Sequence, residues 1–364
     1  MTTNYVELAN KIALDKRSRV LRSMVLDALE GGGRGHLGPA LSLLEIVRAL
    51  YDSVLNHDPS NPLLVSRDRF VLSKGHGCLG LFTVLADHGY FPTSELRGFC
   101  SFESNLGGHP ERATLPGIEF STGALGHGLS VGVGMAMAAR FERGLLDPQA
   151  EKNKSIFDHY IYVLASDGDL QEGVSAEASS IAGLQKLHNL IVIYDDNDIT
   201  IEGNISLAFR EDVDARYRAY GWNVLNVGTA KDGSVDIDAL HIALEAARSQ
   251  SEQPTLIRLK SVIAWPAPKL QGTSKSHGAA LGKDEVAATK LALGLNPDED
   301  FQLPEDVLAH VRLVAERGAA LHREWNAQFK AWQAANPGRA EVLARMESRE
   351  IDSTILDEIR ADFS

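Results

Sequence analysis

The sequence has very few cysteines, no excess of basic charge and no long apolar run, and each absence excludes a class of protein. Cys78 and Cys100 are the only cysteines in 364 residues and form no CxxC pair, which argues against a disulfide framework or a cysteine zinc site. The net charge is −13 and no basic stripe occurs, so nucleic acid is not an expected partner. No segment has the length of a membrane span, and the N-terminal residues lack the apolar core of a signal peptide. We therefore expect a cytoplasmic globular protein without a membrane partner.

Common nucleotide-binding and metalloprotease motifs are absent too. The segment LSKGHG (72–77) lacks the GxxxxGK[ST] pattern of a P-loop. The segment GHGLSV (126–131) begins as GxG but has Val131 where a dinucleotide-binding loop needs its third glycine. No HExxH zinc motif occurs.

The order of apolar segments predicts an α/β fold. Apolar strands alternate with amphipathic helices in the middle of the chain, which is typical of a mostly parallel sheet covered by helices on both faces. A charged, Ala-rich helical pattern follows from about residue 304. We expect an α/β domain over 1–300 and a helical linker or arm over 301–364. The expected strands are 69–73, 159–165, 190–195, 222–227 and 255–260, and the expected helices are 4–30, 41–55, 76–88, 124–141, 172–187, 210–220 and 236–249.

The helix expected over 124–141 is rich in glycine. Each glycine inside a helix costs about 1 kcal/mol relative to alanine. Gly126, Gly128, Gly132 and Gly134 therefore indicate that another backbone, a ligand or a neighbouring helix approaches closely.

Two expected strands end in polar side chains. Asp167 and Asn197 stand thirty residues apart, which is one strand-helix-strand step. Ligands of such sheets bind at the carboxyl ends of the strands, and Mg²⁺ takes one or two oxygen ligands from protein and others from phosphates. Alternatively, Asp167 or Asp169 caps a helix and 195–197 forms a turn. For the pair at this spacing, a metal site is favoured.

Four histidines lie in loops flanked by glycine or other small residues. They are His36, His76, His109 and His277. A single loop histidine is usually solvated, but four such loops in one domain fit a polar cavity for phosphate and hydroxyl groups.

The segments that carry these residues resemble the signature loops of transketolases. SDGDLQEG (166–173), continued by NLIVIYDDNDITIEG (189–203), is similar to the thiamine-diphosphate motif, which runs from GDG to a downstream asparagine. SKGH (73–76), GGHPE (107–111), STGALGHG (121–128) and SHGAALG (276–282) follow the family's order. The resemblance extends from about residue 10 to about residue 340 and implies the thiamine-diphosphate-binding fold.

The resemblance also implies a role for individual residues. Mg²⁺ or Ca²⁺ would bind to Asp167, Asn197 and the Ile199 carbonyl. Thiamine diphosphate would contact His76, Gly123, Leu125, Gly168, Ile201 and His277. His36, His109 and His277 would line the substrate channel, where they stabilise or transfer protons on sugar hydroxyls. Glu172 and Glu177 would join a carboxylate network between the two cofactor sites of a dimer.

This sequence departs from the family pattern at three positions. Ser166 replaces the first glycine of GDG and is small enough for binding to survive. His127 replaces a glutamine, which could change contacts beside the cofactor. Leu37 replaces a proline, which predicts a less rigid loop.

Full-length family members are about twice this size. They add a pyrimidine-binding domain and a third domain, which supply the activating glutamate, the aromatic pocket for the aminopyrimidine and the arginines that bind the sugar phosphate. We therefore expect half an active site, a homodimeric core, and a partner chain that completes an α₂β₂ heterotetramer.

With that partner, the resemblance implies transfer of a two-carbon ketol unit from a ketose or ketose phosphate to an aldose acceptor. Two alternatives stay open. One is another thiamine-diphosphate enzyme, similar to deoxyxylulose-phosphate synthase or to 2-oxo-acid decarboxylases. The other is a non-catalytic scaffold of the same fold, although a scaffold has no need of the metal and histidine positions.

Overall fold

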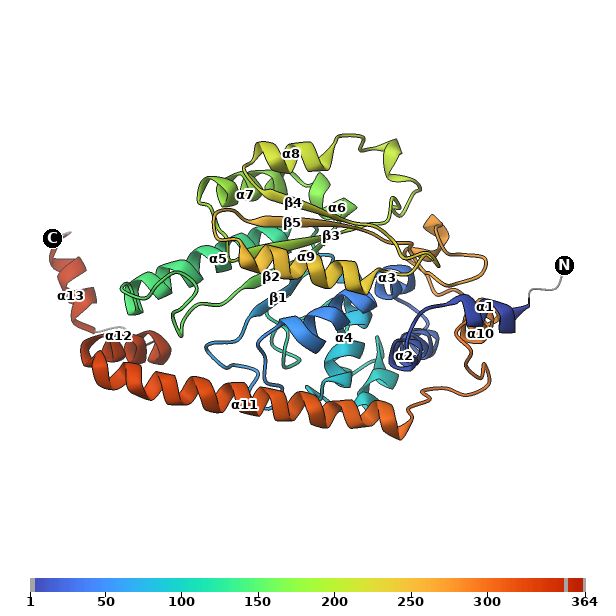
Figure 1. The fold of residues 1–364 in the computed structure, drawn as a ribbon, viewed down its shortest axis with the longest axis horizontal. Coiled ribbons are helices and arrows are strands. Elements are labelled where there is room, and N and C mark those ends of the chain that lie inside the picture. Colours follow the sequence, from blue (N-terminus) through green and yellow to red (C-terminus); the bar gives the residue numbers. More distant parts are fainter. Residues whose placement is uncertain (1–3, 350–352, 363–364) are drawn as a thin grey trace.

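The computed structural model describes residues 4–349 and 353–362, and its centre is a five-stranded parallel sheet (Figure 1). The strands lie in the order β1-β2-β3-β5-β4. Strands β2 and β3 are neighbours and align Ser166 with Asp195, so both end at the same edge of the sheet. The expected parallel sheet is confirmed. The strand bounds are β1 Arg69–Leu72, β2 Ile161–Ser166, β3 Leu190–Asp196, β4 Asn223–Val227 and β5 Thr255–Lys260.

The central strands are buried on both faces. Successive side chains of a strand point to opposite faces, and in β2 Val163 belongs to one hydrophobic cluster while Leu164 belongs to the other. Val192 and Ile193 of β3 divide in the same way. Every residue of these two strands is buried, which explains their nearly continuous apolar sequences. Full burial stabilises by about 1.5–3 kcal/mol for each such aliphatic side chain, so the strands that carry the site are firmly held.

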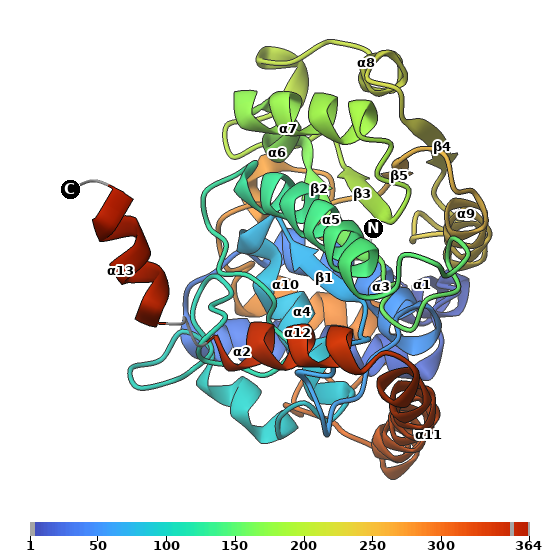
Figure 2. The ribbon, with the colours of Figure 1, turned by 90° about the vertical axis from the view of Figure 1, so that its left-hand side faces the viewer.

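Helices cover each face, as the alternating pattern predicted. Helices α5, α7 and α8 pack on the face of Val163, and helices α2, α3, α4 and α9 pack on the face of Leu164 (Figures 1 and 2). Between β2 and α7 lies a short helix, α6, that the sequence did not indicate. The bounds are α2 Lys16–Gly32, α3 Leu37–Ala49, α4 Cys78–Asp87, α5 His127–Leu146, α6 Asp167–Gln171, α7 Gly173–Leu184, α8 Val213–Ala219 and α9 Ile237–Ser249.

Two N-terminal helices differ from their expected bounds. The helix expected over 4–30 is two helices, α1 (Tyr5–Lys11) and α2, because Asp15 caps α2 by accepting a hydrogen bond from the Ser18 amide at 2.7 Å. The helix expected over 41–55 begins at Leu37 and continues into a π-helical turn, Leu50–Val54. Leu37 is therefore a buried residue of a helix rather than part of a loop.

The glycine-rich sequence of α5 predicted the close approach of another segment, and two glycines of this helix allow such an approach. A β-carbon on Gly128 would lie 2.5 Å from the Ser73 α-carbon, and one on Gly132 would lie 2.4 Å from Val163 Cγ2. Helix α5 thus packs tightly on β1 and β2. Gly134 differs, because a β-carbon there would meet nothing within 4 Å.

The last part of the chain is largely helical, and most of it packs on the α/β core, whereas the described side chains of α13 (Ser353–Asp362) are exposed (Figure 2). Helix α11 runs along the lower edge of the molecule in Figure 1. Its Trp325 indole donates to the Ile156 carbonyl at 2.9 Å, and Trp332 packs against Phe157 at 4.8 Å between ring centroids. The sequence did not predict α10. The bounds are α10 Lys283–Ala292, α11 Glu305–Ala335, α12 Pro337–Ser348 and α13 Ser353–Asp362.

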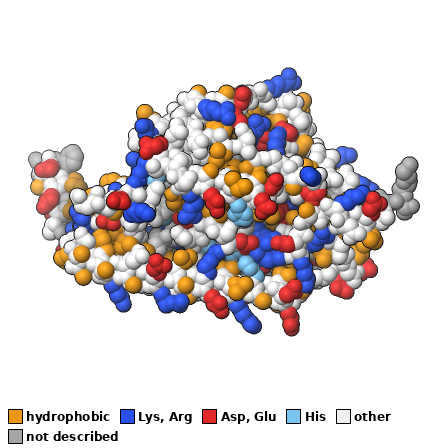
Figure 3. All heavy atoms as spheres, in the orientation of Figure 1, with side chains coloured by type: hydrophobic (Ala, Val, Ile, Leu, Met, Phe, Trp, Pro, Cys, Tyr) orange, Lys and Arg blue, Asp and Glu red, His pale blue; other side chains and the backbone are white. Residues whose placement is uncertain are grey.

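Surface charge is mixed on the face that Figure 3 shows, where acidic and basic side chains are interspersed. Within residues 4–349 and 353–362, no helix combines the length and the apolar character that crossing a membrane requires.

Candidate functional site

One cavity at the carboxyl ends of the strands contains all the catalytic, cofactor and metal candidates carried over from the motifs. Its volume is about 440 Å³, within the usual range for small-molecule sites. We call it the histidine cavity. Segments far apart in the chain meet there because β1, β2, β3 and β5 all end at this edge. The candidates that line it are His36, His76, His109, Gly123, Leu125, Asp167, Gly168, Glu172, Asn197, Ile199, Ile201 and His277.

Asp167 is the buried carboxylate of this cavity. It is the first residue of α6, directly after β2, and its Oδ1 accepts a hydrogen bond from the Tyr194 hydroxyl at 2.5 Å. Its Oδ2 is buried and has no hydrogen-bond partner in the described part of the chain. Burial, followed by the charges of Asp196 and Asp195, raises the pKa of Asp167 to about 7. A cation beside Oδ2 would remove this cost, so the carboxylate is suited to bind a metal ion.

Asp169 has a structural role instead. It is fully buried, and its two oxygens accept hydrogen bonds from the Ser73 hydroxyl, the Gly126 amide and the Ser166 amide and hydroxyl. Ser166 caps α6 through this pair, which explains how a serine is accommodated at that position. Asp169 thus joins the loops after β1 and β2 to the start of α5.

Lys74 lies in the same cavity and was missed by the sequence analysis. It is fully buried and forms an ion pair with Asp195, the residue aligned with the end of β2. Asp195 also accepts hydrogen bonds from Ser42, at 2.9 Å, and from Ser261. The signal was available, because Lys74 follows the end of an apolar strand in the same way as Asp167 does.

Asp196 is occupied by other partners. Its carboxylate pairs with Arg258 at 2.6 Å and with Lys260 at 3.0 Å. Asn197, the next residue, lines the cavity. Its Oδ1 accepts from the Ile199 amide at 3.1 Å, which folds the chain back at the end of the strand.

The histidines form a compact group. His36 lies 5.3 Å from His76, 6.2 Å from His109 and 6.0 Å from His277, measured between ring centroids. The rings of His76 and His277 stack at 5.1 Å. Burial, with the nearby charge of Lys74, lowers the pKa of His277 to about 4 and that of His76 far below its usual value. Burial also lowers the pKa of His36, so these rings are neutral hydrogen-bonding groups near pH 7.

Several polar atoms of the cavity lack a partner. In addition to Asp167 Oδ2, the Nδ1 atoms of His36 and His277 and the Nε2 of Gln171 are buried without a hydrogen bond among the described residues. Buried polar groups are normally paired, so four unpaired atoms around one cavity fit a polar ligand that supplies both donors and acceptors. Gln171 carried no signal in the sequence.

Two residues named from the sequence lie outside the cavity. His127 is exposed at the start of α5, where its Nδ1 lies 3.1 Å from the Leu125 carbonyl oxygen. Glu177 is exposed on α7, and Glu172 is also exposed although it lines the cavity.

A second cluster, Asp52, His88 and His310, has the geometry of a metal site but not its electrostatics. One ligand atom from each residue lies within 4.8 Å of the others. However, the guanidinium of Arg17 donates to both Asp52 oxygens, at 2.7 and 2.8 Å, and Arg48 Nε lies 3.1 Å from Oδ2. Two cations already neutralise this carboxylate, so it is an ion pair that links α2 and α3.

Comparison with known proteins identifies the family. A family model described as transketolase, thiamine diphosphate binding domain, matches residues 15–351. The chain belongs to the transketolase family. The expected fold and the thiamine-diphosphate-binding character of the domain are thereby confirmed.

Curated and solved relatives extend this result. Transketolase from Mycobacterium leprae is 45% identical over 332 residues, which cover 91% of this chain and 47% of the relative. Transketolase from Geobacillus stearothermophilus is 42% identical and covers 89% of this chain and 48% of its own length. A solved transketolase from Pichia stipitis superimposes with a TM-score of 0.86 at 37% identity, covering 93% of this chain and 49% of that one. The chain thus spans about half the length of the transketolases it matches.

Proposed function

We propose that this chain is the diphosphate-binding half of a two-component, thiamine-diphosphate-dependent transketolase. With a partner that carries the pyrimidine-binding domain, it would transfer a two-carbon ketol unit from a ketose or ketose phosphate to an aldose acceptor. The observation that carries this proposal is the group of four unpaired buried atoms around the histidine cavity. A scaffold would have no reason to keep them unpaired.

The metal site would use oxygen donors only. Asp167 Oδ2, the Asn197 side-chain oxygen and the Ile199 carbonyl would hold Mg²⁺ or Ca²⁺, and one formal charge among three donors leaves phosphate oxygens to complete the shell. Tyr194 keeps Asp167 oriented through its hydrogen bond to Oδ1.

The remaining residues would bind and orient cofactor and substrate. Thiamine diphosphate supplies an electron sink for the carbanion, and the protein positions it. The His76 and His277 rings and the Gly168 backbone would face the diphosphate. A β-carbon at Gly168 would lie 2.8 Å from Leu125 Cδ1, so a side chain there would require Leu125 to move. Gly123, Leu125 and Ile201 would contact the rings of the cofactor.

An imidazole ring can donate and accept hydrogen bonds, and it can take up or release a proton. His36, His109 and His277 would therefore hydrogen-bond to the sugar hydroxyls and move protons on them. Their mutual distances place a sugar within reach of more than one ring.

The partner surface would lie on α5 and α7, beside Glu172 and Glu177. Apolar side chains are exposed on both helices, and large exposed patches of this kind mark protein interfaces. They are Met137, Phe141 and Leu145 on α5 and Val174, Ile181 and Leu184 on α7. This supports a homodimeric core and an α₂β₂ assembly in the cytoplasm, in keeping with two free thiols.

The test is a reconstitution of activity. The purified chain should be assayed alone, and with a chain from the same genome that carries a pyrimidine-binding domain, in the presence of Mg²⁺ and thiamine diphosphate. We expect ketol transfer from a ketose phosphate in the mixture only, and a heterotetramer by light scattering.

Three outcomes would contradict the proposal. Turnover of pyruvate without ketose turnover would assign a different thiamine-diphosphate reaction. Full activity of the chain alone would rule out the two-component arrangement. Absence of any cofactor binding in the assembled complex would favour the scaffold.

A further inference from the structure

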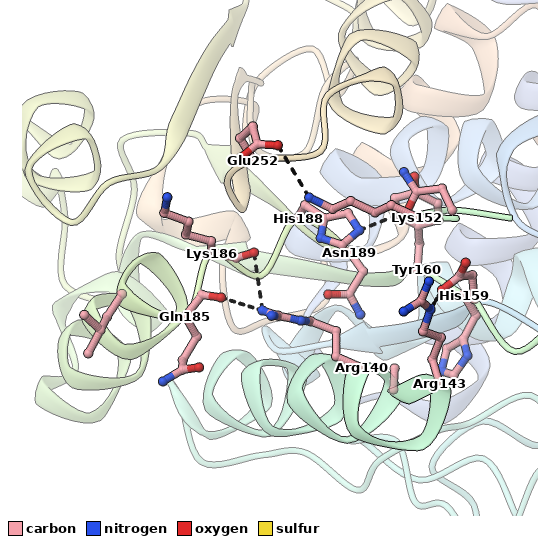
Figure 4. A pocket seen from close by; sticks show the side chains of 14 residues that line it. Arg140, Arg143, Lys152, His159, Tyr160, Gln185, Lys186, His188, Asn189 and Glu252 are labelled. Carbon is pink, nitrogen blue, oxygen red and sulfur yellow. Dashed lines mark hydrogen bonds and ion pairs between the residues drawn. The ribbon is translucent and has the colours of Figure 1, made fainter. Parts of the chain in front are cut away.

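A second cavity, of about 510 Å³, lies at the amino ends of the strands, opposite the histidine cavity (Figure 4). We call it the amino-edge cavity. Tyr160 and Asn189 line it, and they directly precede β2 and β3. The second half of α5 and the end of α7 form other walls. No residue lines both cavities, so the two are separate.

Cations outnumber carboxylates in the amino-edge cavity. Its charged lining residues are Arg140, Arg143, Lys152, Lys186, Asp158 and Glu252. The local formal charge is thus +2, in a chain whose net charge is −13. A concave surface with this excess of positive charge attracts small anions.

Backbone carbonyls hold both arginines, and Arg143 also forms a loose ion pair, because its Nε lies 3.8 Å from Asp158 Oδ1. Figure 4 shows Arg140 extending from α5 to the backbone carbonyls of Gln185 and Lys186, to which its Nη1 donates. Arg143 Nη2 donates to the Ala150 carbonyl. A carbonyl oxygen orients the guanidinium group without cancelling its charge. Each guanidinium group retains further N–H donors that can bind a ligand. This arrangement suits a phosphate group, which binds arginine by two parallel hydrogen bonds.

The lysines are more exposed. Lys152 donates to the Ser251 carbonyl and lies 3.6 Å from Glu252 Oε1. The Lys186 ammonium has no hydrogen bond or ion pair to the residues that the structure describes, and the side chain is exposed at the rim. It can therefore turn toward a bound anion at little cost.

The floor of the cavity contains an unpaired acceptor. Asn189 is buried, and its Nδ2 donates to the Ala136 carbonyl at 3.1 Å. Its Oδ1 has no hydrogen-bond partner in the described chain and is out of contact with solvent. Such an acceptor calls for a donor, and a ligand hydroxyl would supply one after a small movement of the side chain. The neighbouring His188 is already bonded to Asn153 Oδ1 at 2.9 Å.

We propose that the amino-edge cavity binds a small metabolite that carries a phosphate group and hydroxyl groups, at a site separate from the histidine cavity. Arg140 and Arg143 bind the phosphate, Lys186 closes over it from the rim, and the hydroxyls meet the side chains of the floor. This inference does not depend on the reaction proposed above.

The experiment is a calorimetric titration of the full chain with glucose 6-phosphate, at low ionic strength, without Mg²⁺ and thiamine diphosphate. Glucose serves as the uncharged ligand. We expect binding of the phosphate ester only, weakened at least tenfold by Arg140→Gln and about threefold by Lys186→Gln. The matched control is Arg210→Gln, which replaces another exposed arginine held by a backbone carbonyl, and it should leave affinity unchanged.

Further variants keep the test decisive. His76→Ala should retain binding, because His76 lines the other cavity. If Arg140→Gln unfolds the chain, Lys186→Gln decides, since its side chain supports no described contact. The proposal is wrong if no phosphate ester binds, if Arg210→Gln weakens binding equally, or if only His76→Ala abolishes it.

Discussion

The two cavities lie at opposite edges of one sheet, and they are built from different kinds of residue. Among the described residues, the histidine cavity has one buried cation, Lys74, which is already paired with Asp195, and burial lowers the pKa values of His36, His76 and His277. In the amino-edge cavity Arg140, Lys152 and Lys186 are exposed and Arg143 is half-buried, and two carboxylates compensate only part of their charge. Binding in the first therefore depends mainly on hydrogen bonds, whereas binding in the second depends on surface charge and should respond to salt.

The polarity of the fold explains part of this difference. In a parallel sheet, helices run opposite to the strands, so helix N-termini lie near the carboxyl edge and helix C-termini near the amino edge. The start of α6 places Asp167 in the histidine cavity, and the last carbonyls of α7 bind Arg140. Helix C-termini attract cations, so a cationic amino edge follows from the architecture itself. The helix dipoles thus favour side chains of opposite charge at the two edges, independently of any ligand.

The largest expected effect is on stability, and it compares a buried ion pair at the carboxyl edge with an exposed one at the amino edge. Lys74→Met would leave Asp195 as an uncompensated buried charge and should lower the free energy of unfolding by about 3–5 kcal/mol. Lys152→Met is the matched change at the amino edge, where the ion pair with Glu252 is exposed, and should cost no more than about 0.5 kcal/mol. Urea unfolding measures both. Equal losses would remove the distinction between the edges.

The next effect concerns the metal site. Asp167→Asn keeps the shape of the side chain but removes its charge, and should weaken Mg²⁺-dependent binding of thiamine diphosphate at least 100-fold, or about 2.8 kcal/mol. The variant without ligands should be at least as stable as the wild type, because an unpaired buried carboxylate is removed. Calorimetry and thermal unfolding follow the two properties.

Asp198→Asn is the control for this change. Asp198 is the exposed neighbour of Asn197 and pairs with Lys260 at the surface, so cofactor affinity should not change. Asp169→Ala is unsuitable as a control, because Asp169 joins three segments by hydrogen bonds. Unchanged affinity in Asp167→Asn would disprove the metal site.

The smallest effect is a dependence of stability on pH at the amino edge. Burial, with the charge of Arg69, lowers the pKa of His159 to about 3 from an ordinary value of 6.5. The unfolded chain therefore binds the proton first as pH falls, and stability is lost below pH 6.5, by about 1.4 kcal/mol per pH unit for each such histidine. His159→Gln should reduce the slope of unfolding free energy between pH 6 and pH 4 by about that amount. A slope that His159→Gln leaves unchanged would show that this ring is accessible to protons in the folded chain.

Much of the histidine cavity could be predicted because the apolar runs of the buried strands show where these strands end. Asp167 and Asn197 were located in this way, and the register of β2 and β3 confirms that they share an edge. Lys74 follows the same rule and could have been found. Gln171 could not, because it lies in the five-residue helix α6, which is too short to produce a periodic pattern.

Other differences between the expected and the observed structure have local causes. The division between α1 and α2 depends on the cap at Asp15, inside a stretch whose apolar spacing is continuous. Helix α10 lies between two glycines and has little amphipathic character, so propensity gave no clear indication. The amino-edge cavity could not be predicted from the sequence either, because its cations come from three separate segments, and no motif joins Arg140 to Lys152 or Lys186.

The hydrogen bonds of Asp169 have a consequence for the order of folding. Its partners Ser73 and Gly126 are 96 and 43 residues away in the chain, so these bonds close long loops. Contacts between distant segments form slowly, because the entropy of loop closure is lost before they contribute. We expect the ability to bind cofactor to return after helical circular dichroism when the chain refolds from urea, and simultaneous recovery would contradict this order. Thiamine diphosphate would then stabilise the folded protein but would have no effect on the early steps of folding.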